Sequence, residues 1–392
     1  MPALNLPTQS GDIEKYTLSE PRDFTNGQTG ALPRIAYSAV HVVNDPLSDS
    51  DPWLDTVVDW DTTIEFRRHI WSLGLGVAEA MDTAQRGMGM DWPNSLELIK
   101  RSIDAAKDFE KNSGAALLAS GAGTDQLEPG PDVSIDDVIA AYEEQCEAIE
   151  GAGGRIILMA SRALTETATS PDDYLKVYDR ILTQVKEPVV IHWLGEMFDP
   201  ALAGYWGSDD HWAAMDTCLE MLARNAAKVD GIKVSLLNAE KEIAMRNKLP
   251  GGVLMYTGDD FNFPELIAGD DDSYSHALLG IFDAIAPAAS AALQAMGRQD
   301  MDTYHDILAP TVPLSQHIFK APTRFYKTGV VFMAYLNGHQ NHFTLVGGQE
   351  SARSLIHLAE LFRLADKAGL LARPDMATAR MKGLMSVHGI GT

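Results

Sequence analysis

A lysine inside an apolar segment is the residue of this sequence best placed to do chemistry. Lys233 lies in the run VDGIKVS at residues 229–235, which has the composition of a buried strand. Burial favours the neutral amine, because a charged group loses its hydration inside a protein. A neutral amine can attack a ketone or an aldehyde and form an imine, whose protonated form withdraws electrons from the neighbouring carbon. An ion pair with an acidic neighbour is the alternative role for this lysine.

Short apolar segments alternate with longer amphipathic segments from Arg34 onward. Such alternation predicts βα units around a parallel sheet, and eight successive units predict a closed (β/α)8 TIM barrel. An open doubly wound sheet is the alternative, although no GxGxxG motif follows the first strand. The predicted strands span residues 35–43, 76–81, 115–120, 155–160, 189–194, 231–236, 253–257 and 277–281.

The rest of the chain flanks this barrel on both sides. The first residues are rich in Pro, Gly, Thr and Asp without a steady period, which predicts an irregular segment. We therefore divide the chain into an irregular N-terminal extension (1–33), the barrel (34–285) and a C-terminal helical extension packed on the barrel (286–392). The predicted helices span residues 62–73, 96–111, 138–149, 174–185, 212–227, 284–297, 301–319 and 351–368.

Polar residues near the carboxyl ends of the predicted strands are the candidates for a site, because catalytic groups of a barrel project there. His192 lies on the fifth strand, and an imidazole can move protons near neutral pH. A core histidine that donates to a backbone carbonyl is the alternative. Six further residues can hydrogen-bond a small carbonyl substrate, unless they cap helices or bind water. These six residues are Asp82, Thr83, Gln85, Glu196, Thr257 and Asp259.

Four segments resemble motifs of the dihydrodipicolinate synthase and N-acetylneuraminate lyase superfamily. Residues 229–233 (VDGIK) are similar to the family's strand-six Gly-Ile-Lys segment, whose lysine forms the Schiff base with a 2-keto acid. Residues 76–85 (GVAEAMDTAQ) stand where the family has strand two followed by Gly-Thr-Thr-Gly-Glu. Residues 117–124 (LLASGAGT) resemble its Ala-Gly-Thr-Gly-Ala-Asn segment, and residues 257–260 (TGDD) resemble its Ser-Gly-Asp-Asp segment. The resemblance covers about residues 34–319 and implies an aldolase or dehydratase fold.

The sequence departs from the family's pattern at three places, one of which spans two residues. Thr83 matches one of the two threonines that hold the keto-acid carboxylate in the family, but Ala84 occupies the second place. His192 replaces the family's proton-relaying tyrosine, and an imidazole can take the same role. Glu196 and Met197 stand where some members bind a second carboxylate with an arginine. This last departure disfavours the condensation of pyruvate with an acidic aldehyde.

The sequence and the resemblance together predict a Schiff-base-forming lyase that acts on a small keto acid, keto sugar or sugar acid through Lys233. This chemistry needs neither a cofactor nor a metal, because the protonated imine itself withdraws electrons. One alternative is a barrel that binds a small carbonyl ligand without catalysis. Another is a divalent-metal-dependent isomerase or lyase that acts on a sugar. The metal ligands would then be His41, Asp82, His192 and Asp259.

Charge and hydropathy narrow the range of partners. The net charge of −24 would be repelled by nucleic acid and by anionic membranes, so we expect neither as a partner. The N-terminal residues lack a basic head and an apolar run, so we expect a cytoplasmic location. The acidic surface and the extra C-terminal helices fit a homo-oligomer, and the resemblance implies a homodimer or homotetramer.

Overall fold

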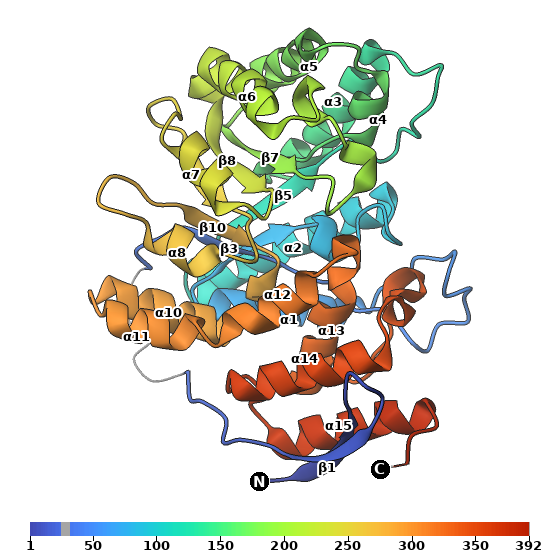
Figure 1. Cartoon of the computed structure of the whole chain (residues 1–392). Helices are drawn as coiled ribbons and strands as arrows, with labels where there is room; N and C mark the ends of the chain where they lie inside the picture. Colours follow the sequence, from blue (N-terminus) through green and yellow to red (C-terminus); the bar gives the residue numbers. More distant parts are fainter. Residues whose placement is uncertain (25–31, 392) are drawn as a thin grey trace.

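The computed structural model describes residues 1–24 and 32–391 of the chain. Parallel strands form one closed barrel, with helices packed around it (Figure 1). Each strand pairs with the next along the chain, and β10 closes the ring by pairing with β3. The predicted TIM barrel is confirmed, and the open-sheet alternative is wrong. The strands are β3 (Ala36–Ala39), β4 (Gly76–Glu79), β5 (Leu118–Ala122), β6 (Ile156–Leu158), β7 (Val189–Leu194), β8 (Val229–Ser235), β9 (Leu254–Thr257) and β10 (His276–Leu279).

Alternation along each strand divides the side chains between the barrel interior and the helix layer. On β8, Ile232 and Val234 belong to the large hydrophobic core beneath the helices, so Lys233 between them faces the interior. The same alternation on β7 turns His192 inward. A separate apolar cluster fills the interior with Tyr37, Ala39, Ala78, Met81, Ala119, Ile157, Met159, Val190, Tyr256 and Leu278. Both faces of the strands are therefore buried, which explains their apolar sequences.

The predicted helices between the strands are all present. Two of them begin at a serine, because Ser134 and Ser170 are the N-cap residues of capping boxes that start α3 and α5. The helices of the barrel are α1 (Trp60–Ser72), α2 (Trp92–Asn112), α3 (Ile135–Gly151), α4 (Arg162–Thr167), α5 (Pro171–Gln184), α6 (His211–Asn225), α7 (Ala239–Arg246), α8 (Phe263–Ala268) and α9 (Ile281–Ala284). Short 3-10 helices are η1 (Asp82–Ala84), η2 (Pro200–Leu202), η3 (Tyr205–Gly207), η4 (Ala226–Lys228), η5 (Thr323–Phe325) and η6 (Val346–Ala352).

The helices after the barrel differ in part from the prediction. They are α10 (Ala286–Gly297), α11 (Met301–Leu308), α12 (Thr311–Phe319), α13 (Tyr326–Asn337), α14 (Leu355–Lys367) and α15 (Pro374–Val387). The prediction of one helix over residues 301–319 is wrong, because the chain breaks around Pro310. Proline lacks the N–H that an α-helix needs at this position, so the run of helical hydrogen bonds is interrupted there. Helices α13 and α15 are absent from the sequence-based prediction.

Helix α13 lies inside the C-terminal extension and has neighbours on all sides. It contacts α9 of the barrel as well as α12, α14 and α15. Ten of its twelve residues are buried. A helix that is buried all round has no polar face and therefore no amphipathic period, which explains why the sequence gives no clear signal for it.

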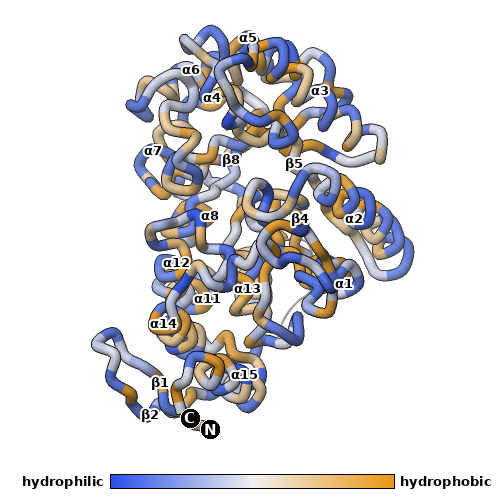
Figure 2. The backbone as a smooth tube through the Cα atoms, turned by 90° about the vertical axis from the view of Figure 1, so that its right-hand side faces the viewer, coloured by the Kyte–Doolittle hydropathy of each residue, from blue (hydrophilic) through white to orange (hydrophobic). Residues whose placement is uncertain are grey.

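The N-terminal residues form a β-hairpin, so the prediction of an irregular segment is wrong for them. Strands β1 (Ala3–Pro7) and β2 (Ile13–Thr17) pair antiparallel. The hairpin packs on α14 and α15 at the end of the molecule away from α5 and α6 (Figure 1, Figure 2). Leu4 and Leu6 are buried there, and the Tyr16 hydroxyl donates to Asp366 Oδ2 at 2.7 Å. Residues 25–31 of the predicted extension lie outside the described residues.

No helix in the described part of the chain is a candidate for spanning a membrane. None of its helices combines the length and the apolar composition that a membrane span requires.

A buried ion pair joins the first two barrel helices to the strand between them. Arg67 of α1 donates from Nε and Nη2 to the two carboxylate oxygens of Glu79 on β4, each at 2.9 Å. Both side chains are fully buried. Ser102 of α2 and the backbone N–H of Ala80 donate to the same carboxylate, and Arg67 Nη1 donates to the His41 carbonyl. The pair thus fixes the end of β4, where the residues of the cavity wall begin.

Replacing Arg67 with methionine should lower the free energy of unfolding by about 3–5 kcal/mol, because Glu79 would stay buried without its cation. Adding Glu79→Gln to that variant should restore part of the loss. Chemical denaturation followed by circular dichroism measures both effects. Arg68→Met is the matched control, since Arg68 pairs with Asp108 near the surface, and its loss should cost less than about 1 kcal/mol. Equal losses for the two arginine variants would contradict this account.

Candidate active site

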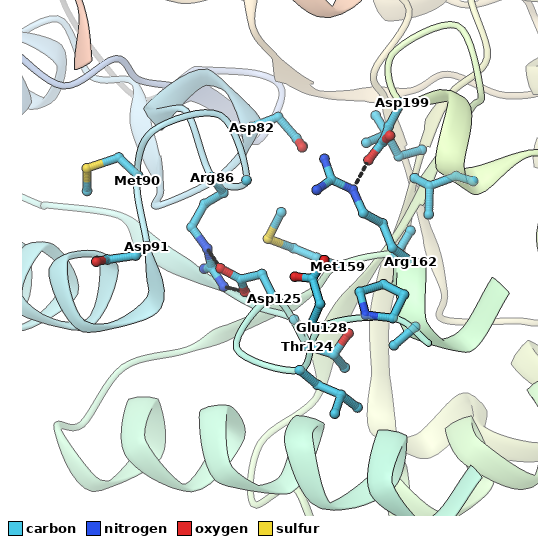
Figure 3. A pocket seen from close by; sticks show the side chains of 18 of the residues that line it. Asp82, Arg86, Met90, Asp91, Thr124, Asp125, Glu128, Met159, Arg162 and Asp199 are labelled. Carbon is cyan, nitrogen blue, oxygen red and sulfur yellow. Dashed lines mark hydrogen bonds and ion pairs between the residues drawn. The ribbon is translucent and has the colours of Figure 1, made fainter. Parts of the chain in front are cut away.

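A cavity of about 480 Å³ opens at the carboxyl ends of the barrel strands (Figure 3). Its walls come mainly from the segments after β4, β5, β6 and β7, where catalytic groups of a barrel project. Two of the predicted site residues, Asp82 and His192, line it directly. The other charged or hydroxyl side chains of the wall are Thr56, Arg86, Asp91, Thr124, Asp125, Glu128, Arg162 and Asp199.

Arg86 is a fixed part of this wall. Its Nε atom donates to Asp125 Oδ2 at 3.0 Å, and Nη2 donates to Gln145 Oε1 at 2.8 Å. The Nη1 atom donates to the carbonyls of Ala80 and Gly121. Because these bonds occupy the guanidinium, Arg86 holds the loops after β4 and β5 together.

Lys233 lies next to His192 in the barrel interior, because β7 and β8 pair in that register. The residue is 7% exposed, and no carboxylate oxygen of the described residues lies within 4.0 Å of its ammonium group. Burial lowers the pKa of Lys233, although Asp82 and Asp260 act in the opposite direction. The amine is therefore closer to its nucleophilic form at neutral pH than a surface lysine is.

The segment after β9 passes directly over the Lys233 side chain. A Cβ atom at position 258 would lie 2.8 Å from Lys233 Cε, so glycine is needed there. Asp260 follows two residues later, and its Oδ1 atom accepts from the Ile281 N–H at 2.8 Å. Burial raises the pKa of Asp260 to about 7, while the Ile281 N–H and Lys233 oppose the rise. The sequence TGDD thus brings a glycine against the lysine and places a carboxyl group near it.

His192 is fully buried, and its ring makes one side-chain contact that orients it. Its Nε2 atom lies 3.2 Å from Ser235 Oγ, whereas Nδ1 has no hydrogen-bond partner within the described residues. The ring therefore makes no bond to a backbone carbonyl there. Burial lowers the pKa of His192 well below its usual value, and the Lys233 charge adds to the effect. The imidazole is accordingly neutral and able to accept a proton.

Thr83 is tied to α13 rather than to the cavity wall. Its hydroxyl lies 2.8 Å from the Tyr326 hydroxyl. Tyr326 stacks on Phe319 with ring centroids 4.4 Å apart. Burial raises the pKa of Tyr326 well above its usual value, so the phenol stays protonated. Ala84 is buried beside Thr83 and offers no hydroxyl group.

Gln85 and Glu196 make contacts within the protein and do not line the cavity. Gln85 Nε2 donates to the Val346 carbonyl at 2.6 Å and so holds η6 near the barrel. Glu196 Oε2 lies 3.1 Å from His211 Nε2, at the start of α6. A role for either residue in substrate binding stays a prediction.

Thr257 and Asp259 likewise bond to their own surroundings. The Thr257 hydroxyl donates to Glu242 Oε2 at 2.9 Å. The Asp259 carboxylate accepts from the backbone and the side chain of Asn262, which fixes the turn before α8. Neither residue lines the cavity, so their binding roles also stay predictions.

The four residues of the metal-site alternative do not come together. Within residues 1–24 and 32–391, no group of three or more His, Cys, Asp or Glu side chains is arranged to hold a metal ion. His41 is instead bound through Nδ1 to Asp283 Oδ2 at 2.7 Å, and Asp259 is bound within its own turn. The geometry therefore gives this alternative no support.

The sequence-based prediction missed two polar residues near the site, Tyr326 and Lys327. Both lie at the start of α13, in the sequence YKTGVVFMAYLN. The signal was a lysine followed by an apolar run, which is the same signal that identified Lys233. The sequence gives no sign that this lysine joins the site, because it does not lie at the end of a predicted strand.

Solved structures of dihydrodipicolinate synthases share this fold. The enzyme from Aquifex aeolicus has a TM-score of 0.65 and 11% identity, with 87% of this chain and 99% of that chain covered. A prophage protein of the dihydrodipicolinic acid synthase family from E. coli K12, in complex with pyruvate, has a TM-score of 0.64 and 13% identity, with 87% and 100% covered. The 4-hydroxy-tetrahydrodipicolinate synthase from Methylacidiphilum fumariolicum SolV has a TM-score of 0.62 and 12% identity, with 90% and 99% covered.

At these identities the likeness concerns the fold, and at that level it confirms the resemblance inferred from the motifs. None of the curated proteins matches the sequence. One family model, described as "Protein of unknown function (DUF993)", matches residues 4–390 and thus almost the whole chain. The chain therefore belongs to the DUF993 family, and it has the barrel fold of the dihydrodipicolinate synthases.

Proposed function

We propose that this chain is a Schiff-base-forming lyase, either an aldolase or a dehydratase, that binds a small keto acid, keto sugar or sugar acid through Lys233. The position of Lys233 carries the proposal. The lysine faces the barrel interior beside His192, and no carboxylate oxygen of the described residues is in contact with it. His192 lines the cavity, whereas Lys233 lies behind it in the barrel and is not itself a lining residue. Burying an amine in this way costs free energy that a mere scaffold would not need to spend.

The reaction would begin with attack of Lys233 Nζ on the carbonyl carbon of the substrate. Loss of water from the carbinolamine gives the imine, and its protonated nitrogen accepts electron density from the adjacent carbon. That adjacent carbon can then lose a proton, or a carbon–carbon bond to it can be broken. The neutral imidazole of His192 lies beside Lys233 and can accept and return the proton, with Ser235 orienting the ring.

Two carboxyl groups support this chemistry from different places. Asp82 lines the cavity, where its oxygens can accept hydrogen bonds from hydroxyl groups of a sugar or sugar acid. Asp260, with a pKa of about 7, can donate or accept a proton near neutral pH. The preference for a polyhydroxylated substrate rests on these residues and on His192.

We also propose a cytoplasmic location and assembly as a homodimer or homotetramer. Both proposals rest on the sequence pattern and on the family resemblance. Size-exclusion chromatography with light scattering would give the number of subunits directly.

Borohydride reduction after incubation with pyruvate, or with a panel of keto sugars and keto sugar acids, should trap one adduct on the Lys233 peptide. Intact and peptide mass spectrometry measure its mass and position. Lys233→Ala should abolish the adduct, whereas Lys228→Ala, at a lysine just before the same strand, should retain it. An adduct on Lys327 instead, or none with any carbonyl compound, would refute the proposal.

The trapping rate should rise with pH through the pKa of Lys233, because only the neutral amine attacks a carbonyl. Asp82→Asn and Asp260→Asn should each move the midpoint to lower pH, since both carboxylates favour the ammonium form. Asp216→Asn, on the exposed face of α6, is the control and should leave the midpoint in place. A midpoint that moves to higher pH in the first two variants would be inconsistent with the electrostatics described above.

A further inference from the structure

Two cations that the imine chemistry does not use lie on the cavity wall or just behind it. The first is Arg162, which follows β6 and lines the cavity. Its side chain is 42% exposed, and its Nε atom donates to Asp199 Oδ2 at 2.5 Å. Figure 3 shows the outer end of the guanidinium turned into the cavity on the side of Asp82. The two Nη atoms are therefore available to a ligand.

The second cation is Lys327, the second residue of α13, which does not line the cavity but lies close enough for the lining residues Asp82, Asp199 and Arg162 to act on its charge. It is 4% exposed, and its Nζ atom donates to the Arg324 carbonyl at 3.1 Å and to Met88 Sδ at 3.3 Å. No carboxylate oxygen of the described residues lies within 4.0 Å of it. Burial lowers its pKa to about 8, although Asp82 and Asp199 favour the charged form. The Tyr326 ring adds a cation–π contact at 4.7 Å from its centroid. A thioether, one carbonyl and an aromatic ring carry no full negative charge, so the site lacks an anion.

These two cations lie on the side of the opening away from the Lys233 strand. Met88, which contacts Lys327, follows β4, whereas Lys233 lies on β8, and these strands are four positions apart in the eight-stranded ring. Arg162 reaches the same loop, because a Cβ atom at position 87 would lie 3.0 Å from its Nη1 atom. The N-terminus of α13 adds partial positive charge on this side.

We propose that the substrate carries an anionic oxygen group, a carboxylate or a phosphate, which Lys327 and Arg162 bind on the side of the cavity opposite Lys233. This inference rests on the proposed function, because it assigns the far end of the substrate whose carbonyl group Lys233 holds. The family's arginine for a second carboxylate is missing at Glu196 and Met197. In this proposal, cations from α13 and from the segment after β6 take its place. The substrate class thus becomes a ketone with a remote negative charge.

The first arm of the test measures anion binding without any carbonyl chemistry. Calorimetric titration with inorganic phosphate, and separately with acetate, distinguishes the two anionic groups by their affinity. Lys327→Met and Arg162→Gln should each weaken the binding of the preferred anion at least about tenfold, the loss expected for one charge-assisted bond. Lys233→Ala and the exposed-site control Lys320→Met should bind it as the unchanged protein does.

The second arm compares borohydride trapping of 4-oxopentanoate with that of its neutral methyl ester, which has the same ketone and the same chain. The acid should be trapped at Lys233 at least about tenfold more efficiently, and Lys327→Met should remove this preference while the ester reacts as before. Equal trapping of acid and ester, with anion binding unchanged in Lys327→Met, would overturn the inference and leave the imine proposal standing. Anion binding that depends on Lys327, with no adduct from any ketone, would support the anion site and refute the imine.

Discussion

Closure of the parallel sheet is the constraint on which the rest of the molecule depends. The pairing of β10 with β3, from Ala277 and Ala36 onward, removes the free edges and directs the carboxyl ends of all strands to one opening. Residues that are far apart in the sequence, such as Asp82 after β4 and Lys233 on β8, thereby come to act on each other electrostatically. The same closure makes the interior apolar, so any polar group within it must be compensated or used.

Burial in that interior accounts for the chemistry of the site as a whole. It lowers the pKa values of Lys233 and His192 and raises that of Asp260 to about 7. The result is an amine whose neutral form is more accessible than that of a surface lysine, a neutral imidazole, and a carboxyl group that titrates near neutral pH. These shifts favour the protonation states that imine formation and proton transfer require, and they follow from the position of each group in the barrel.

The barrel was predictable from the sequence because strands buried on both faces leave continuous apolar runs, and the helices between them are amphipathic. The site was predictable where it follows a strand, as for Lys233 and His192. Helix α13 was not predictable, because burial on all sides removes the alternation of polar and apolar residues that marks a helix. Lys327, its second residue, was missed for the same reason. The contacts that occupy Gln85 and Thr257 depend on residues distant in the chain, which local patterns cannot reveal.

The central claim is that Lys233 Nζ forms a covalent bond to the carbonyl carbon of the substrate. A crystal structure of the protein treated with pyruvate and borohydride tests it most directly. The account predicts continuous electron density from Lys233 Nζ to the former carbonyl carbon, with the bound group next to His192 in the cavity. Density attached to Lys327 or to a surface lysine, with Lys233 unmodified, would contradict it.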